Sequence, residues 1–301
     1  MRMKNKWYQL LLLGAFILLS ARVSAEPIKV ASWNIEWLTT SPSSSITASQ
    51  RTAQDFHLLN QKFRQIAPDI LAFQEVDSKA AIEQVVGSGY QIYLSDRSLT
   101  PHKQFNDLNQ YTGFAISSDW HVSDPQDIEL LPNSKLRFAS YLIVRKSTGP
   151  DIHLLAVHLK QGCAAAKKRS RSCRQLAQQA QQLNQWMQQR LSRQQAFIVL
   201  GDFNHNLAYP GDWLWQQLQH GIEHQLELAT RTTKARCQVQ SNRDPKRLYR
   251  YPNLIDHIIV SKPSLSRDTE QILFTQEEAL HHHLSDHCPV VSQIEFRKSS
   301  K

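Results

Sequence analysis

Short apolar runs recur along almost the whole chain, and their alternation with helical segments limits the possible folds more than any other feature. The runs that we predict as strands span residues 28–34, 70–74, 112–117, 136–144, 152–158, 197–200, 254–260 and 290–294. Between them we predict helices at 51–66 and 174–193. In the second helix, apolar residues recur at three- and four-residue steps, and glutamines lie between them. This alternation is typical of a layered α/β protein.

The composition agrees with a folded protein of this kind. The chain has 301 residues, of which 41% are hydrophobic and 20% charged, which excludes a disordered or linker-dominated protein. That length fits either two average domains or one large domain. Because no repeat or low-complexity linker divides the chain after residue 25, we predict a single domain over residues 26–298.

The first 25 residues are predicted to be a secretory signal peptide. Arg2, Lys4 and Lys6 precede an apolar run at 10–19, and the small residues Ser24 and Ala25 form a cleavage pattern. The run is shorter than the ~20 apolar residues that span a bilayer. We therefore expect a bacterial-type exported protein, periplasmic or extracellular, with no transmembrane segment after cleavage. An uncleaved N-terminal anchor is the alternative.

The four cysteines are expected to form disulfides, because an even number of cysteines in an exported protein usually does so. Cys163 and Cys173 are near neighbours on either side of a polar loop, and we favour a bond between them. This pairing leaves Cys237 with Cys288. The alternative for the second pair is that Cys288, which lies beside an apolar strand, is a buried free thiol.

Polar clusters stand at the ends of several predicted strands. They are Trp33-Asn34-Ile35-Glu36, Gln74-Glu75, Val157-His158, Gly201-Asp202-Phe203-Asn204, Asp256-His257 and Ser285-Asp286-His287. Each cluster alone is compatible with an ordinary turn or a surface hydrogen bond. Their joint occurrence, in this order, predicts one site built from several strand ends.

This set of clusters resembles the endonuclease/exonuclease/phosphatase superfamily, which includes deoxyribonuclease I, sphingomyelinases and inositol polyphosphate phosphatases. The resemblance covers essentially the whole chain after residue 25. It implies an α/β (α+β) fold of the deoxyribonuclease I type, a four-layer α/β/β/α sandwich in which two mixed sheets pack together with helices outside. The active site would lie at the edge where the strand ends converge.

The resemblance also implies a metal-dependent phosphoesterase. Hydrolysis of a phosphate ester needs a hard cation, an activated water and stabilisation of the departing oxyanion. Glu75 is the best candidate for the metal carboxylate, with Asn34 and Asp286 beside it, because oxygen ligands suit Mg²⁺. Mn²⁺ and Ca²⁺ are alternatives. Glu36 is expected near the metal without binding it directly.

The family pattern assigns catalytic roles to the other clusters. Asp202 would orient or deprotonate the water, and Asn204 would hold a phosphate oxygen. His287, oriented by Asp256, would act as base or stabilise the charge of the transition state. His158 matches a histidine that lies over the phosphate, although the acidic partner of that histidine has no match near residues 111–113.

Substrate class is predicted from the distribution of positive charge. The net charge is +9, and the four basic residues within positions 1–25 contribute to it without any acid. Two basic runs lie next to catalytic strand ends. They comprise Lys167, Lys168, Arg169, Arg171 and Arg174 after His158, and Arg231, Lys234, Arg236, Arg243, Lys246, Arg247 and Arg250 before Asp256.

We predict that these runs form a basic rim that binds nucleic acid, with Lys167, Lys168, Arg169 and Arg171 as substrate-binding residues. The resemblance implies that Arg137, near the start of the strand predicted at 136–144, contacts phosphate; the alternative is a solvated charge at the strand edge. The predicted activity is therefore phosphodiester hydrolysis of DNA or RNA by a monomer without a stable protein partner. The alternatives are a phospholipid or small-molecule phosphoesterase and, from another class, a non-catalytic binding module.

Overall fold

The computed structural model describes residues 26–147, 149–241, 244 and 246–296. The predicted signal peptide, residues 1–25, lies outside the described residues, as do the last two residues of the predicted domain. In the part of the chain that is described, no helix combines the length and apolar character needed to cross a membrane.

Within the described residues, one six-stranded sheet contains both ends of the domain. Its order is β13 (Leu265–Gln271), β14 (Val290–Glu295), β1 (Ile28–Leu38), β2 (Ile70–Val76), β4 (Tyr111–Ser117) and β3 (Tyr90–Leu94). β1 and β2 are parallel, with Asn34 opposite Gln74, whereas the other pairs are antiparallel. The parallel pair brings the carboxyl ends of β1 and β2 to the same edge.

The second six-stranded sheet of the described chain is built in a similar way. Its order is β5 (Trp120–Ser123), β6 (Ser140–Lys146), β7 (Ile152–His158), β8 (Ala196–Asp202), β12 (Asp256–Ser261) and β9 (Leu226–Leu228). β7 and β8 are parallel, with His158 opposite Asp202. β12 is antiparallel to β8, so Asp256 at its start also lies opposite Asp202.

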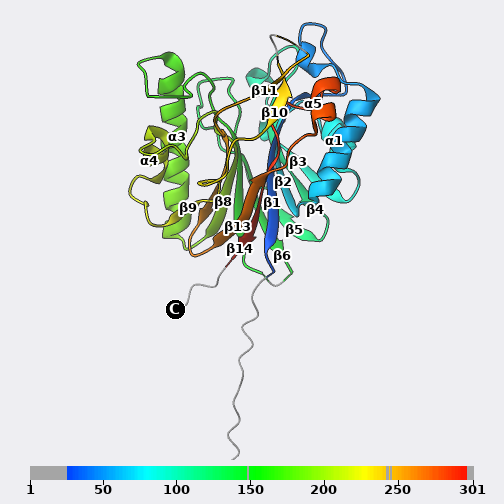
Figure 1. Cartoon of the computed structure of the whole chain (residues 1–301). Helices are drawn as coiled ribbons and strands as arrows, with labels where there is room; N and C mark the ends of the chain where they lie inside the picture. Colours follow the sequence, from blue (N-terminus) through cyan, green and yellow to red (C-terminus); the bar gives the residue numbers. More distant parts are fainter. Residues whose placement is uncertain (1–25, 148, 242–243, 245, 297–301) are drawn as a thin grey trace, which may run out of the picture.

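The two sheets pack face to face and helices cover their outer faces (Figure 1). Apolar residues from both sheets, among them Ala72, Leu154 and Ile258, are fully buried between them. α1 (Ala53–Ile66), α2 (Lys79–Val86) and α5 (Gln276–His281) cover the first sheet, and α3 (Arg171–Ser192) and α4 (Trp213–Gln219) cover the second. This arrangement confirms the predicted four-layer sandwich.

Helix boundaries follow from the sequence at their first turns. The hydroxyl of Thr52 accepts a hydrogen bond from the Asp55 N–H, and the Asp55 side chain accepts one from the Thr52 N–H, so α1 begins at Ala53. Ser170 caps α3 in a simpler way. On α3, Leu176, Leu183 and Met187 are fully buried against the second sheet, and each such side chain contributes roughly 1.5–3 kcal/mol by burial.

Some predicted boundaries are wrong by a few residues. The strand predicted at 136–144 begins only at Ser140 and runs to Lys146, so Leu136 and Arg137 precede it. The strand predicted at 254–260 is β12, which begins at Asp256. The helix predicted at 174–193 starts three residues earlier, at Arg171, because Ser170 supplies the cap.

Both predicted disulfides are present in the structure. Cys163 and Cys173 are joined, as are Cys237 and Cys288, so the free-thiol alternative for Cys288 is wrong. The second bond fastens a separate hairpin, β10 (Gln238–Gln240) and β11 (Leu248–Arg250), to the segment that precedes β14. In Figure 1 this hairpin lies at the upper edge, opposite the end where β1 begins.

Candidate active site

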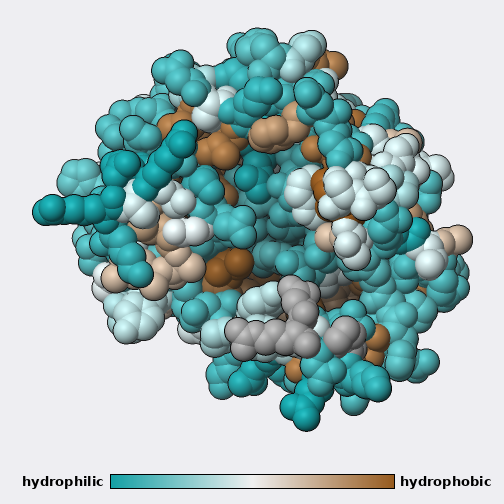
Figure 2. Space-filling model, turned by 90° about the horizontal axis from the view of Figure 1, so that it is seen from above, coloured by the Kyte–Doolittle hydropathy of each residue, from teal (hydrophilic) through white to brown (hydrophobic). Residues whose placement is uncertain are grey.

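The predicted catalytic and metal-binding residues lie at one edge of the sandwich. The ends of β1, β2, β7 and β8, the start of β12 and the segment before β14 all meet there. Seen from above, this face is hollowed, and hydrophilic side chains line much of the hollow (Figure 2). The structure therefore brings together residues that are up to 254 positions apart in the sequence, such as Trp33 and His287.

Asn34 lies between two of the carboxylates. Its Nδ2 donates to Oε1 of Glu75 at 3.2 Å and to Oδ2 of Asp202 at 3.1 Å. Its Oδ1 accepts from the backbone N–H of Glu36 at 3.0 Å. Asn34 thus fixes the relative position of the carboxylates that the two sheets contribute.

The backbone is unusual at the residues that hold this cluster. Glu75 and Asn204 have positive φ angles of 60° and 52°, which are uncommon for residues other than glycine. Before Asp202, Gly201 has φ +146°, and a Cβ there would lie 2.0 Å from the carbonyl oxygen of Val157. The glycine in Gly201-Asp202-Phe203-Asn204 therefore lets β8 approach β7 closely, which brings Asp202 opposite His158.

Asp202 and Asn204 form a compact turn after β8. The Asn204 N–H donates to Oδ1 of Asp202 at 2.7 Å, and the Asn204 side chain donates to Oδ2 of Asp202 and to the carbonyl of Leu159. Burial raises the pKa of Asp202 to about 7, and the negative charges of Asp256 and Glu75 add to this effect. A carboxyl with such a pKa is suited to exchange a proton near neutral pH.

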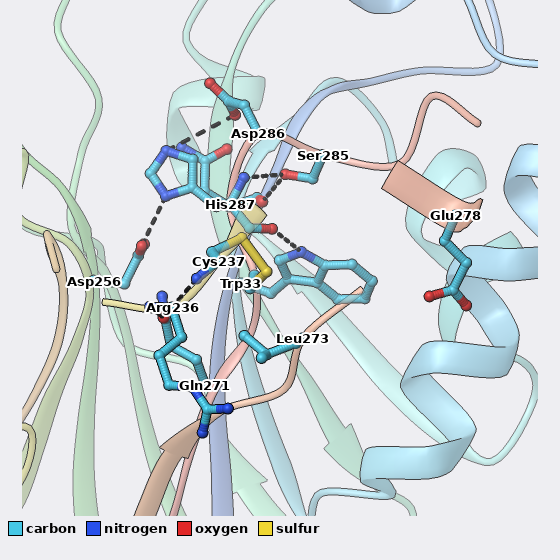
Figure 3. Close-up of a disulfide and its surroundings, with 12 residues drawn as sticks. Trp33, Arg236, Cys237, Asp256, Gln271, Leu273, Glu278, Ser285, Asp286 and His287 are labelled. Carbon is cyan, nitrogen blue, oxygen red and sulfur yellow. Dashed lines mark hydrogen bonds and ion pairs between the residues drawn. A yellow bond between two sulfur atoms is a disulfide. The ribbon is translucent and has the colours of Figure 1, made fainter. Parts of the chain in front are cut away.

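His287 forms a buried pair with Asp256. Its Nδ1 lies 2.7 Å from Oδ2 of Asp256, while its Nε2 lies 3.9 Å from Asp202 and 3.8 Å from Asp286. Figure 3 shows Asp256 and Asp286 on either side of the ring. Burial alone would lower the pKa of His287, but the charge and hydrogen bond of Asp256 hold this pKa well above its usual value. His287 is therefore a cation that faces the cleft.

The backbone of His287 is also fixed. Its carbonyl accepts from Nε1 of Trp33 at 3.1 Å, and its N–H donates to Oγ of Ser285 at 3.0 Å. The Ser285 hydroxyl in turn donates to the carbonyl of Asn34 at 2.7 Å. These contacts join the segment before β14 to the end of β1, so they fix the position of the His287 ring relative to the side-chain amide of Asn34.

His158 has a cationic neighbour in place of an acidic partner. Nε of Arg137 donates to Nδ1 of His158 at 3.1 Å, and Nη2 lies 2.7 Å from Nε2. The nearest carboxylate oxygens, of Asp202 and Glu75, lie 3.5 and 3.7 Å from Nε2. Burial and the charge of Arg137 lower the pKa of His158 well below its usual value. The ring is therefore neutral, which suits a hydrogen-bonding role better than that of a general acid.

Arg137 was expected either to contact phosphate or to be a solvated charge. The contacts with His158 exclude the solvated charge, and a role toward phosphate stays a prediction. Arg137 reaches the cleft from the segment before β6.

The donor set of the cleft suits a hard divalent cation. Among the described residues, the cleft holds more carboxylates than cationic groups. The carboxylates are those of Glu36, Glu75, Asp202, Asp256 and Asp286. Burial raises the pKa of Asp286 to about 6, with Glu36 and Glu75 adding to the effect. Oδ1 of Asp256 is buried without a hydrogen-bond partner in the described part of the chain. Oxygen donors with excess negative charge are what Mg²⁺ and similar ions prefer.

A second grouping overlaps this set. Ligand atoms of Asp202, Asp256 and His287 all lie within 4.8 Å of one another, close enough to share an ion. Of the predicted ligands, Asp286 lies on the other side of the His287 ring from Asp256 (Figure 3). Asn34 contacts both Glu75 and Asp202. The cleft therefore offers oxygen ligands on both sides of His287.

Several residues that support the site were not predicted from their sequence context. The side chain of Gln110 donates to Oε2 of Glu75, which also accepts from the Trp37 N–H. Arg51 Nη2 donates to the carbonyls of Ile35, Glu36 and Leu284, and so ties the turn after Asn34 to the segment before Ser285. Arg51 could have been noticed as a cation at the start of a predicted helix, whereas Gln110 lies outside every motif.

The predicted basic rim is exposed. Lys167, Lys168, Arg169 and Arg171 lie in or just after the connection from β7 to α3, and Nζ of Lys167 lies 5.0 Å from the ring centre of Trp213. This connection begins at Leu159, whose carbonyl contacts Asn204. The second basic run lies around the β10–β11 hairpin, except for Arg243, which is outside the described residues.

Comparison with known proteins agrees with this geometry. The sequence profile of the Endonuclease/Exonuclease/phosphatase family matches residues 31–287. No protein of curated function matches the chain. A structure of an endonuclease/exonuclease/phosphatase family protein from Bacteroides thetaiotaomicron is 19% identical, with a TM-score of 0.63, and the match covers 90% of this chain and 98% of that one.

Two further solved structures share the fold. Truncated TDP2 of Caenorhabditis elegans is 18% identical, with a TM-score of 0.60 and coverage of 90% of this chain and 98% of that one. A mannosyl-6-phosphatase of Bacteroides thetaiotaomicron is 17% identical, with a TM-score of 0.64 and coverage of 89% and 100%. At these identities the likeness concerns the fold.

Proposed function

Because the chain belongs to the Endonuclease/Exonuclease/phosphatase family, we propose that it is a divalent-metal-dependent phosphodiesterase that hydrolyses nucleic acid outside the cytoplasm. The observation that carries the reaction is the cationic His287–Asp256 pair, which faces Asp202, Asn34 and Glu75 across one cleft. The observation that carries the substrate class is the exposed basic rim beside that cleft.

The chain's own residues account for activation of the water and for charge stabilisation. Asp202, with its raised pKa, accepts a proton from the attacking water as the bond from phosphorus to the leaving oxygen breaks, and that oxygen takes up a proton from solvent. Asn204 keeps the carboxylate of Asp202 in place. The imidazolium of His287 donates a hydrogen bond to the phosphoryl oxygens, where negative charge grows. His158, kept neutral by burial and by the charge of Arg137, adds a second donor next to Asp202.

A metal ion would be held by Glu75 and Asp286, with Asn34 beside them. When bound, Mg²⁺, Mn²⁺ or Ca²⁺ would act as a Lewis acid on the phosphate oxygens. The crowded carboxylates of Glu36, Glu75 and Asp286 support such an ion, since buried negative charges are otherwise costly inside a protein.

A polyanionic substrate is favoured by the charges around the cleft. The exposed cations of the β7–α3 connection and of the β10–β11 hairpin begin directly beside site residues. A substrate with a single phosphate would use few of them, whereas nucleic acid would contact many. The two disulfides and the pattern of residues 1–25 support export, since disulfides persist in oxidising compartments.

One assay tests the proposal and its alternatives. The exported protein is incubated with plasmid DNA, RNA, a sugar phosphomonoester and sphingomyelin, each with Mg²⁺ or with excess chelator, and the His287→Ala variant is the control. We expect hydrolysis of DNA or RNA that requires the metal and His287. Preference for the phosphomonoester, in line with the mannosyl-6-phosphatase likeness, or for the lipid would overturn the nuclease proposal. Full activity in chelator would overturn the metal dependence.

A further inference from the structure

Two tyrosines stand exposed on the hairpin that borders the cleft. Tyr249 lies on β11 and Tyr251 follows it directly, with 47% and 41% of their surfaces exposed. Their ring centres are 5.0 Å apart and their planes are nearly perpendicular, at 85°. Large aromatic side chains that stay exposed as a fixed pair are a common feature of binding surfaces.

The pair lies next to the catalytic cleft. Tyr251 is five residues before Asp256, the partner of His287, and the intervening Asn253 contacts Asn206 of the turn after β8. A ligand on the tyrosines would therefore lie beside a phosphate in the cleft.

The hairpin is fastened close to His287. The Cys237–Cys288 disulfide links the residue before β10 to the residue after His287. The N–H groups of Arg236 and Cys237 both donate to Oε1 of Gln271 on β13, as Figure 3 shows around the disulfide. Val239 is buried opposite Tyr249 in the ladder. Because these contacts already hold the hairpin in place, the protein would lose little conformational freedom when a ligand binds to it.

The surroundings of the rings are cationic. Arg250 lies between the two tyrosines in sequence. Arg236, two residues before β10, and Arg247 are also exposed, and Asp244 pairs with Arg247. A lipid-binding surface would expose aliphatic side chains, but Leu248 of the hairpin is partly buried and packs against the apolar core beside the first sheet. Aromatic rings among cations suit planar bases joined by phosphates.

We propose that Tyr249 and Tyr251 form a stacking platform for the base of the nucleotide next to the scissile phosphodiester. This inference rests on the proposed nuclease function. It assigns the hairpin a role in choosing substrate, because a base can stack there only when it is not paired within a duplex. The protein should therefore prefer single-stranded nucleic acid or frayed ends.

The test compares ring removal in the protein with base removal in the substrate. The double variant Tyr249→Ala/Tyr251→Ala should raise the KM for a single-stranded oligonucleotide about 10- to 100-fold with little change in kcat, since base stacking on aromatic side chains has that magnitude. The wild type should bind an oligonucleotide that lacks the base beside the cleavage position more weakly than the intact oligonucleotide. The double variant should bind the abasic and the intact oligonucleotide equally weakly. The double variant Tyr249→Phe/Tyr251→Phe, which keeps both rings, should retain the wild-type KM.

A binding measurement separates this inference from the proposed function. Fluorescence anisotropy of the labelled oligonucleotide in excess chelator should show the same loss of affinity, and Tyr209→Ala, which removes another exposed tyrosine, should show none. If the wild type binds and cleaves nucleic acid but the tyrosine variants behave like it, the stacking inference is wrong and the nuclease survives. If the wild type neither binds nor cleaves nucleic acid, both are wrong.

Discussion

His287 and Asp202 are the two side chains on which the proposed chemistry depends most. His287→Gln removes the cation that Asp256 maintains, and Asp202→Asn removes the proton acceptor while keeping its size. Each change should lower kcat on a small phosphodiester by at least ~100-fold, the lower range for a positioned acid-base or oxyanion group. Neither should shift the thermal midpoint greatly. The exposed His121→Gln is the control, and near wild-type turnover in either site variant would contradict the assignment.

A buried histidine far from the cleft should make the fold sensitive to acid. His153 on β7 is 3% exposed, and its Nδ1 lies 2.5 Å from the hydroxyl of Tyr141. Burial, with a smaller contribution from the charge of Arg190, lowers the pKa of His153 to about 4. In the unfolded chain this histidine takes up its proton near pH 6.5, whereas in the folded protein it does so only near pH 4. The folded state is therefore fully stable with respect to His153 above pH 6.5, and it loses stability as the pH falls from 6.5 toward 4.

The loss amounts to at most about 3 kcal/mol. Urea unfolding at several pH values should show a stability slope between pH 6.5 and 4 that flattens in His153→Asn, which keeps an acceptor near Tyr141. His121→Asn, on the exposed strand β5, should leave the slope unchanged. An equal slope in both variants would show that His153 does not carry this effect.

At the scale of elements, the two disulfides should differ in their effect on catalysis. The chain-entropy estimate is about 4 kcal/mol for Cys237–Cys288, which spans 51 positions, and about 3 kcal/mol for Cys163–Cys173, which spans 10. Replacing either pair by alanine should lower the thermal midpoint. Only the Cys237/Cys288 variant should also lose turnover at temperatures where it is folded, because Cys288 follows His287. Equal turnover in the two variants would contradict this coupling.

The elements show where sequence reasoning succeeded and where it could not. Strands such as β7 and β8, buried on both faces, were recognised by their continuous apolar runs. The edge strand β13 (Leu265–Gln271) was missed because it pairs only with β14 and carries polar residues. The strand predicted at 136–144 begins only at Ser140, and Arg137 before it contacts His158 of a distant segment.

The same reason limits prediction of the site. Asn34, Glu75, Asp202 and His287 could be predicted because each lies in a short pattern at a strand end, and the structure brings them together. Gln110 lies in no pattern, and its contact with Glu75 depends on how β4 pairs with β2. Side chains that support a site through tertiary contacts leave little trace in the local sequence.

On the scale of the whole molecule, the placement of positive charge should govern binding rather than chemistry. Lys167, Lys168, Arg169 and Arg171 are exposed beside the cleft, where they would meet phosphates remote from the scissile one. Replacing all four by serine should raise the KM for long nucleic acid. Because each phosphate contact adds roughly 0.7–0.9 to the slope of log affinity against log salt, the magnitude of the slope should fall by about 3 to 4 if all four residues contact phosphate.

The structure supplies a matched control for this change. Arg64, Arg145, Arg193 and Lys262 are also exposed, but they lie at the opposite end of α1, β6, α3 and β12 from the cleft. Serine at these four positions alters the net charge by the same amount, so any effect of overall charge on the encounter with nucleic acid is common to both variants. Only the variant beside the cleft should show the raised KM and the reduced salt slope. If both variants change KM and its salt slope equally, the protein attracts nucleic acid by net charge alone, and the basic rim has no specific part in binding.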